Sequence, residues 1–319
     1  MNLPNPLCRG DKVSLVATAR KVSPSEVEPA VELLRSWGLQ PFLSDGLFAA
    51  DNQYAGSDEH RAHLFQSAIN DPDVRVVFCC RGGYGTARII DRIDFSPLAR
   101  NPKWIVGYSD VTVLHSHIHT HLALPTLHAT MPINIAHDDF DSPAVRSLHD
   151  CLFGVGDCAY RFDTMTNPVN RAGHAEAVVV GGNLSILYSL IGTPSDIDTN
   201  GKILFIEDLD EYLYHIDRMM QALRRSGKLA GLKGLIVGQF TDMHDNAISF
   251  GRSVEEIVLD AVADYDYPVC FNAPFGHIGN ANLALPLGVS ASLSVSPATA
   301  HLSFHEASHT DNNHTVHNS

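Results

Sequence analysis

One serine, Ser109, lies in a local setting in which a side-chain hydroxyl can become a nucleophile. It follows the apolar run Trp104 to Gly107 and precedes a helix-like stretch that runs to His121. A serine at such a strand-to-helix turn projects its hydroxyl from the sheet edge, where the helix N-terminus stabilises negative charge. The generic nucleophile turn has a second glycine where this chain has Val111. Taken alone, the turn therefore also fits an ordinary helix N-cap.

A serine nucleophile needs a base to take its proton and a carboxylate to orient that base. His277 lies between glycines in the segment Pro274 to Asn280, which is typical of an exposed loop. Glu207 closes the apolar run Lys202 to Ile206 and begins an acidic cluster. A surface histidine and solvated or capping acids remain the alternatives, but this base and this acid are the candidates for completing a triad with Ser109.

Two glycine turns could supply backbone N–H groups to a substrate. Gly82 and Gly83 follow the second of the predicted strands and could bind the oxygen of a carbonyl under attack. The segment RGGYG lacks both the P-loop pattern and the dinucleotide pattern, and no lysine follows it, so we do not favour a phosphate loop. The turn Gly181-Gly182-Asn183 is better explained as the start of a helix, with Asn183 as a cap or a substrate contact.

Four histidines alternate along the stretch His115 to His121 and suggest a metal site. On a helix they form two i, i+4 pairs on different faces, so all four cannot bind one ion. No H-E-x-x-H carboxylate accompanies them. We therefore favour a structural role over zinc binding and expect no metal ion in the site.

The bulk composition limits the class of protein. With 319 residues, 45% of them hydrophobic, the chain can form one large core or two of ordinary size. Its net charge of −14 offers no basic stripe for phosphates, so we do not expect nucleic acid as a partner. We read no export signal and no membrane span. Six cysteines without CxxC spacing fit free thiols in a reducing compartment, so we expect a cytoplasmic protein.

The elements that must position these residues alternate in the first third of the chain. Lys12 to Ala17 and Val74 to Cys80 are predicted strands, and a capping box at Ser23 to Glu26 begins a helix that ends near Trp37. Thr86 to Arg92 is predicted as another helix. Because the carboxyl ends of parallel strands collect ligands, we expect a pocket between the Gly82-Gly83 turn and the Ser109 turn.

The second half predicts a separate domain. Residues 153–176 are rich in polar residues, glycine and proline and read as a linker between an N-terminal domain, 1–152, and a C-terminal domain, 177–304. The His-rich tail, 305–319, reads as disordered. Further elements are predicted as helices at 184–191, 214–226 and 253–264 and as strands at 177–180, 203–207, 235–238 and 269–271.

Taken in order, five stretches resemble the serine LD-carboxypeptidase family, which also contains the microcin C immunity peptidases. Together they span most of residues 10 to 300, and their combination is far more specific than any one of them. The stretches are RGGYGTARIID from Arg81, WIVGYSDVTVLH from Trp104, GGNLSIL from Gly181, LFIEDLDEYLYHIDRMM from Leu204 and PFGHIGN from Pro274.

The resemblance implies a fold and a set of site residues. The fold is α/β, with a Rossmann-like parallel-sheet N-terminal domain, a distinct smaller α/β C-terminal domain and the active site between them. Ser109 is the implied nucleophile, with Glu207 and His277 from the second domain, and the amides of Gly83 and Asp110 form the oxyanion hole. One departure is the stretch Leu127 to Pro132, where many members have His-Gly-Pro-Met, and it affects the shape of the substrate pocket.

The implied reaction is hydrolysis of an LD-amide bond through an acyl-enzyme without a cofactor. The implied substrate is a cytoplasmic murein tetrapeptide that loses a terminal D-Ala during cell-wall recycling. Candidate substrate contacts are Arg81, Tyr84 and Asn183. Two alternatives stay open: an immunity peptidase that cleaves peptidyl or aminoacyl nucleotide antibiotics, and a peptide-binding module without activity. The oligomeric state, with a homodimer among the options, is also open.

Overall fold

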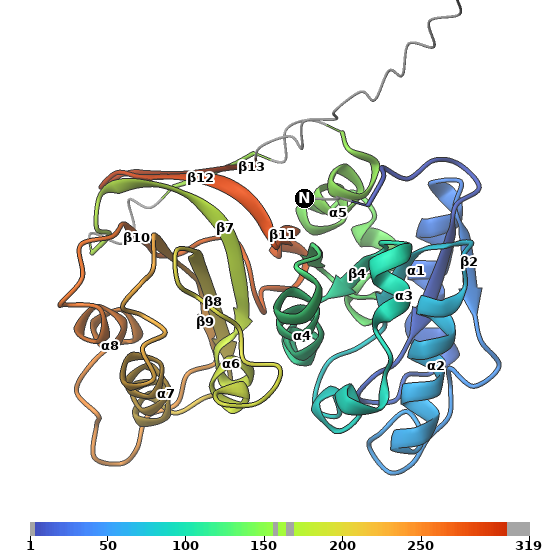
Figure 1. The fold of residues 1–319 in the computed structure, drawn as a ribbon, viewed down its shortest axis with the longest axis horizontal. Coiled ribbons are helices and arrows are strands. Elements are labelled where there is room, and N and C mark those ends of the chain that lie inside the picture. Colours follow the sequence, from blue (N-terminus) through green and yellow to red (C-terminus); the bar gives the residue numbers. More distant parts are fainter. Residues whose placement is uncertain (1–3, 156–158, 164–168, 305–319) are drawn as a thin grey trace, which may run out of the picture.

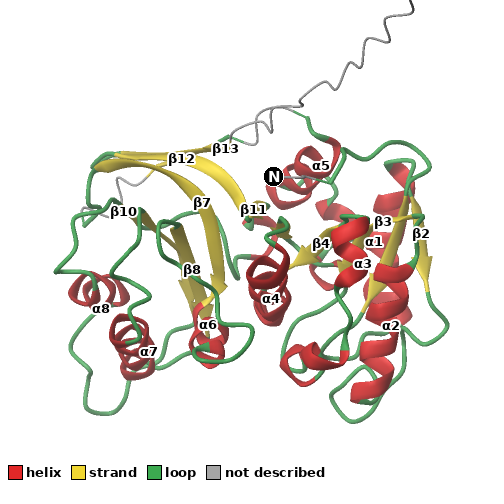
Figure 2. Cartoon of the chain, viewed as in Figure 1, coloured by secondary structure: helices red, strands yellow, loops and turns green. Residues whose placement is uncertain are grey.

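Two β-sheets lie side by side and define two α/β domains (Figures 1 and 2). A computed structural model describes residues 4–155, 159–163 and 169–304. The predicted tail, 305–319, lies outside these residues. The division into a parallel-sheet N-terminal domain and a separate α/β C-terminal domain confirms the expected fold class.

The first sheet has six strands in the order β11-β5-β4-β3-β1-β2. Strands β1 to β5 pair in parallel, and β11 adds to β5 in the antiparallel direction. Their near-continuous apolar runs suit a parallel sheet, which is buried on both faces. The strands are β1 (Lys12–Val16), β2 (Gln40–Leu43), β3 (Val74–Cys79), β4 (Trp104–Gly107), β5 (Thr126–His128) and β11 (Leu285–Leu287).

The first helix of the first domain follows its predicted apolar period closely. The first begins with the expected capping box, in which the backbone N–H of Ser23 donates to Oε2 of Glu26 at 2.7 Å. It ends one residue before Trp37, and Gly38 takes the positive φ expected after a helix. The helices are α1 (Pro24–Ser36), α2 (Asp58–Asn70), α3 (Ser96–Arg100), α4 (Thr112–Leu122) and α5 (Pro143–Phe153).

The second sheet has seven strands in the order β10-β9-β8-β7-β12-β13-β6. Its centre, β7 to β10, is parallel, and β12, β13 and β6 extend it in the antiparallel direction. The strands are β6 (Tyr160–Asp163), β7 (Gly173–Asn183), β8 (Ile203–Leu209), β9 (Gly234–Thr241), β10 (Val269–Cys270), β12 (Val289–Val295) and β13 (Thr299–Phe304). The helices are α6 (Leu184–Leu190), α7 (Leu213–Arg225) and α8 (Val254–Ala261).

Two features of the chain path bear on the predicted domain boundaries. The predicted linker, 153–176, contains β6 and the start of β7, which both belong to the second sheet. Strand β11 comes from the second half of the chain and yet pairs with β5 of the first sheet. The second half of the chain therefore contributes a strand, β11, to the first sheet. The domain boundary at residues 152 and 177 stays a prediction.

One predicted helix is wrong. The stretch Thr86 to Arg92 forms two short 3-10 turns, Thr86–Arg88 and Ile90–Arg92, with i to i+3 backbone hydrogen bonds. The side-chain hydroxyl of Thr86 donates to that of Thr18 at 3.0 Å, and the backbone N–H of Thr86 donates to Asp110. These tertiary bonds fix the first turn and override the local helical pattern. No helix among the described residues is long and apolar enough to cross a membrane.

Candidate active site

Glu207 and His277 form a hydrogen-bonded pair although they lie 70 residues apart in the sequence. Oε2 of Glu207 is 2.7 Å from Nδ1 of His277, and the side chains are 0% and 13% exposed. Glu207 lies in β8, and His277 lies in the loop after β10. Gly276 makes room for the pair, since a Cβ at that position would lie 2.9 Å from Oε2 of Glu207. The carboxylate thus orients the imidazole and leaves Nε2 as the nitrogen available to a substrate or nucleophile.

Ser109 occupies a strained turn directly after β4. Its φ is +63°, a left-handed conformation that few non-glycine residues adopt outside constrained sites. Gly82 lies against it, because a Cβ on Gly82 would be 3.0 Å from Oγ of Ser109 and 3.5 Å from the backbone nitrogen of Asp110. The serine hydroxyl, the Gly82-Gly83 turn and the Asp110 amide therefore gather at one point, where the ends of β3 and β4 meet.

The ring of Tyr108 connects the serine turn to the histidine of the other domain. Its centroid lies 4.7 Å from that of the His277 ring. Among the described residues, no hydrogen bond joins Ser109 to His277. Catalytic hydrogen bonds are commonly longer before substrate binds. The absence of a Ser109–His277 hydrogen bond is therefore compatible with a nucleophile and a base that come together when a ligand binds.

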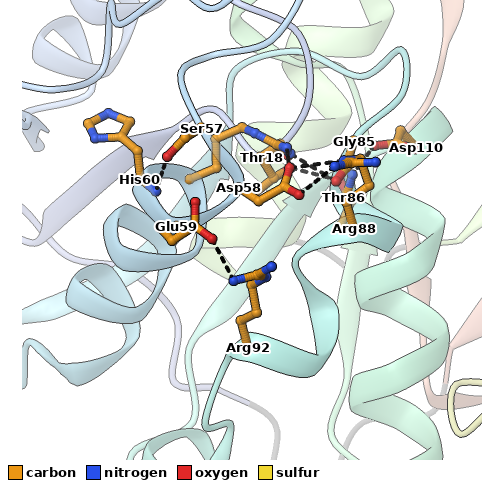
Figure 3. A network of polar contacts seen from close by, with 11 residues as sticks. Thr18, Ser57, Asp58, Glu59, His60, Gly85, Thr86, Arg88, Arg92 and Asp110 are labelled. Atoms are coloured by element: carbon orange, nitrogen blue, oxygen red, sulfur yellow. Dashed lines mark hydrogen bonds and ion pairs between the residues drawn. The ribbon is translucent and has the colours of Figure 1, made fainter.

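A buried arginine holds the glycine turn in place. Arg61 of α2, 1% exposed, donates to the carbonyl oxygens of Thr18 at 2.6 Å and Gly85 at 2.8 Å. It also pairs with Asp58, which binds Arg88 at 2.7 Å (Figure 3). The guanidinium therefore bridges the loop after β1 and the loop after β3 by hydrogen bonds. This rigidity supports the backbone donors beside Ser109.

Asp110 joins the serine turn to the same network. Its Oδ2 accepts a hydrogen bond from the backbone N–H of Thr86 at 2.8 Å (Figure 3). Burial raises the pKa of the Asp110 carboxyl above its usual range. The side chain thus fixes the residue that follows Ser109 against the glycine turn, and its backbone nitrogen lies 3.5 Å from the place that a Cβ on Gly82 would take.

A second chain of hydrogen bonds crosses between the domains. Oγ1 of Thr112, at the start of α4, accepts from the backbone N–H of Asn183 at 3.0 Å. Nδ2 of Asn183 donates to Oδ1 of Asp208 at 2.9 Å. Because Thr112 is three residues after Ser109 and Asp208 is next to Glu207, this chain sets the position of the serine relative to the Glu207–His277 pair.

We expect Thr112→Val to weaken this interdomain connection. Valine keeps the volume of threonine but leaves the buried N–H of Asn183 without an acceptor, which costs about 1–3 kcal/mol. The free energy of unfolding, measured by urea denaturation, should fall by that amount. Thr112→Ser keeps the hydroxyl and should lose less. Equal stability of Thr112→Val and the wild type would contradict the role assigned to this bond.

The histidine-rich helix α4 lies at the junction of the two domains (Figure 1). His117 contacts Oγ of Ser195 at 2.9 Å, and His121 contacts the carbonyl oxygen of Pro194 at 2.8 Å. His115 points the other way and contacts the carbonyl oxygen of Gly107 at 2.9 Å. These partners give the cluster a packing role between the domains. No group of three or more potential metal ligands gathers anywhere in the described part of the chain.

His115 should make the stability depend on pH. Burial lowers its pKa from 6.5 to about 4, so the folded protein binds fewer protons than the unfolded chain between these values. The stability that the neutral imidazole provides is fully present above pH 6.5 and is lost as the pH falls toward 4. The free energy of unfolding should therefore fall by about 2 kcal/mol between pH 7 and pH 5. In His115→Gln, which retains a hydrogen-bond donor, the free energy of unfolding should change less between the two pH values. Urea denaturation at pH 7 and pH 5 measures this change.

A surface variant, His63→Gln, controls for the loss of a histidine as such. The interpretation would be overturned if His115→Gln lost as much stability between pH 7 and pH 5 as the wild type does.

The charge of Glu207 affects two other buried groups. Burial and then the Glu207 carboxylate raise the pKa of Asp208 to about 7. The same two causes, in the same order, raise the pKa of Tyr108 to about 12. Tyr108 therefore stays neutral at neutral pH, with its hydroxyl donating to Asn134 at 3.2 Å. The carboxylate of Glu207 thus raises the pKa of its sequence neighbour, Asp208, and of Tyr108, whose ring contacts that of His277.

The three predicted substrate contacts lie in different surroundings. Arg81 pairs with Glu26 at 3.5 Å and lines a cavity, while Tyr84 is 50% exposed with its ring 6.3 Å from that of Tyr54. Asn183 caps α6 and is 3% exposed, with both ends of its amide in internal hydrogen bonds. All three assignments stay predictions, and the contacts of Asn183 favour the cap.

Sequence reasoning missed two residues that position the site, Arg61 and Thr112. Arg61 carried a usable signal, since a single arginine among the apolar positions of a helix is buried only when it has partners. Thr112 carried none, because its partner is a backbone N–H in the other domain.

Two family models match the chain. The LD-carboxypeptidase N-terminal domain matches residues 13–129, and the LD-carboxypeptidase C-terminal domain matches residues 176–293. Ser109 falls in the first match, and Glu207 and His277 fall in the second.

Relatives and solved structures agree with these matches. A probable murein peptide carboxypeptidase of Bacillus subtilis is 35% identical over 298 residues, covering 93% of each chain. The crystal structure of muramoyltetrapeptide carboxypeptidase from Oxalobacter formigenes has a TM-score of 0.83 at 27% identity, covering 92% of this chain and 99% of that one. Wild-type microcin C7 self-immunity protein shares the fold, with a TM-score of 0.82 at 21% identity, covering 95% and 98%. The chain belongs to the LD-carboxypeptidase family and is a peptide-bond hydrolase.

Proposed function

We propose that this protein is a serine carboxypeptidase that releases the terminal D-Ala of murein tetrapeptide through an acyl-enzyme on Ser109. The observation that carries the proposal is the buried Glu207–His277 pair, 2.7 Å between Oε2 and Nδ1, beside the residue that precedes Ser109. The names of the Bacillus subtilis relative and the Oxalobacter formigenes structure support a murein peptide as substrate.

In the proposed first step, Nε2 of His277 takes the hydroxyl proton of Ser109 while Oγ attacks the scissile carbonyl. Glu207 holds the opposite ring nitrogen and stabilises the imidazolium. The amides of Gly83 and Asp110 bind the oxygen that becomes negative. His277 then gives its proton to the departing amine of D-Ala, which leaves the tripeptide as an ester on Ser109.

In the second step, water attacks the ester and His277 takes its proton. The carbonyl of the acyl group again forms an oxyanion, and collapse restores Ser109 and frees the tripeptide. No cofactor enters this sequence. The strained φ of Ser109 supports the assignment, since such strain concentrates at functional residues.

The proposal includes a cytoplasmic location and a small peptide as the partner. Four cysteines of the described residues, Cys8, Cys79, Cys80 and Cys270, are free thiols, which fits a reducing compartment. A homodimer stays a prediction, and so does the absence of nucleic acid and membrane as partners.

The deciding experiment incubates the protein with four compounds and identifies the products by mass. These are murein tetrapeptide, murein tripeptide, a tetrapeptide with an LL bond, and an aminoacyl sulfamoyl adenosine. We expect D-Ala and tripeptide from the first compound alone. Cleavage of the nucleotide compound in preference would favour an immunity peptidase, and binding of the tetrapeptide without turnover would favour a peptide-binding module.

A further inference from the structure

A cluster of cations lies beside the proposed oxyanion turn, at the carboxyl end of the neighbouring strand. In the first sheet, β4, β3 and β1 are consecutive neighbours. Ser109 follows β4, Gly82 and Gly83 follow β3, and Arg20 and Lys21 follow β1. Because these strands run in parallel, the three segments meet at one edge of the sheet.

These segments surround a cavity of about 360 Å³. The backbone N–H of Arg20 donates to the carbonyl oxygen of Gly82 at 3.4 Å, and that of Lys21 donates to Gln53 at 3.0 Å. The cavity is therefore built by three connected loops. Its lining residues are Arg20, Lys21, Asn52, Gln53 and Arg81.

The lining carries three positive charges and no carboxylate. Glu26 stands near one of them, 3.5 Å from Arg81, and Asp51 accepts a hydrogen bond from Asn52. Among residues 4–155, 159–163 and 169–304, neither Arg20 nor Lys21 forms an ion pair. The cavity is thus a positive site in a chain whose net charge is −14. Two of its cations have their charge available to an incoming anion.

The cavity is close to the predicted nucleophile. The side chain of Arg20 packs on Gly83, where a Cβ would lie 2.3 Å from Cδ of the arginine. Gly83 is adjacent to Gly82, which lies against Ser109. Gly82, which contacts Ser109, and Gly83, which contacts Arg20, therefore have Cα atoms about 3.8 Å apart.

We propose that this cavity binds a carboxylate of the peptide substrate, with Arg20 and Lys21 as its principal ligands. This inference rests on the proposed function and deepens it. A carboxypeptidase must recognise a free carboxylate near the bond it cuts, and the planar guanidinium of arginine matches a carboxylate with two parallel hydrogen bonds. Two carboxylates meet the requirement: that of the terminal residue and the one on the side chain of an acidic diamino acid.

The test compares charge removal on the protein with charge removal on the substrate. Arg20→Met and Lys21→Met keep the aliphatic stem and remove the charge. Arg100→Met, an exposed cation at the end of α3, is the matched control. The substrates are a tetrapeptide whose diamino acid carries a side-chain carboxylate, the same peptide with a terminal carboxamide, and the same peptide with a side-chain carboxamide.

We expect Arg20→Met to lower kcat/KM on the free acid by roughly ten- to a hundredfold, the usual loss for a hydrogen bond to a charged group, and Arg100→Met to leave it unchanged. Lys21→Met should show a smaller loss. On one of the two carboxamide peptides, the kcat/KM of the wild type should fall by a similar factor relative to the free acid. The kcat/KM of Arg20→Met should be the same on that carboxamide as on the free acid. That carboxamide identifies the bound carboxylate.

Equal kcat/KM for the wild type, Arg20→Met and Lys21→Met on the free acid would overturn the inference, as would the same loss on all three peptides. Binding to Ser109→Ala and to Ser109→Ala/Arg20→Met, measured by calorimetry, separates this outcome from failure of the proposed function. Binding that weakens without Arg20, in a protein whose wild type releases no D-Ala, would sink the function and keep the cavity. No binding of the free acid to Ser109→Ala would sink the cavity assignment.

Discussion

Ser109→Ala is expected to lower kcat for D-Ala release on the order of 10⁶-fold and to leave substrate binding largely intact. Without the hydroxyl no acyl-enzyme can form, and what remains is the contribution of the backbone donors and of binding. Alanine tolerates the backbone at this position about as well as serine does, and the side chain is only half-buried. The loss should therefore come from chemistry and not from unfolding.

Steady-state kinetics with mass detection of D-Ala measures this effect, and the unfolding midpoint tests the fold. Ser189→Ala, on the exposed face of α6, removes another serine hydroxyl from a helix and serves as the control. The double variant Ser109→Ala/His277→Ala should be no slower than either single variant, since the residues of a triad act as one unit. Turnover by Ser109→Ala within tenfold of the wild type would rule out the serine as nucleophile.

Elements such as α1 were predictable from the sequence because local chemistry decides them. The capping box at Ser23, the apolar period that follows it and Gly38 together define α1 to within a residue. The alternation of strands and helices likewise led to a parallel first sheet. The stretch after Gly85 failed because Thr86 bonds to residues far away in the sequence, and no period within seven residues encodes such partners.

The sequence could name the candidate residues of the site but not the contacts that hold them in place. The sequence marks Ser109, Glu207 and His277 by the predicted turns and strand ends at which they lie. The geometry depends on contacts between segments: Arg61 on two carbonyl oxygens, and Thr112 on an amide of the second domain. Such contacts involve backbone atoms, which every residue has, so no residue type marks them in advance.

The position of α4 explains why the two domains act as one unit at the site. The helix begins just after Ser109, contacts β7 and α6 of the second domain, and packs beside β5 of the first. Strand β11, which pairs with β5 and contacts β7, adds a further connection between the domains. Ser109 of one domain and the proposed base, His277, of the other are therefore held by packing on both sides, as a reaction that needs precise alignment requires.

Glu207→Gln tests the other half of the proposed triad and is expected to lower kcat on the order of 10⁴-fold. Glutamine has nearly the same shape and can still face Nδ1 of His277, but it carries no negative charge to stabilise the imidazolium. The free energy of the transition state rises for that reason. Gly238 and Gly276 lie against the Glu207 side chain, and a glutamine of nearly the same shape fits the same space. Values of kcat across pH, together with the unfolding midpoint, measure the effect.

The chain contains a matched control for this substitution. Glu211 and His215 form another carboxylate–imidazole pair, 2.5 Å between Oε2 and Nδ1, at the start of α7. Glu211→Gln breaks a pair of the same chemistry outside the proposed triad and should keep kcat within a few-fold of the wild type. If both variants lost activity equally, the loss would reflect the removal of a Glu–His pair in general. A loss confined to Glu207→Gln would assign the orienting carboxylate to this position, because its partner, His277, has its ring 4.7 Å from that of Tyr108 in the serine turn.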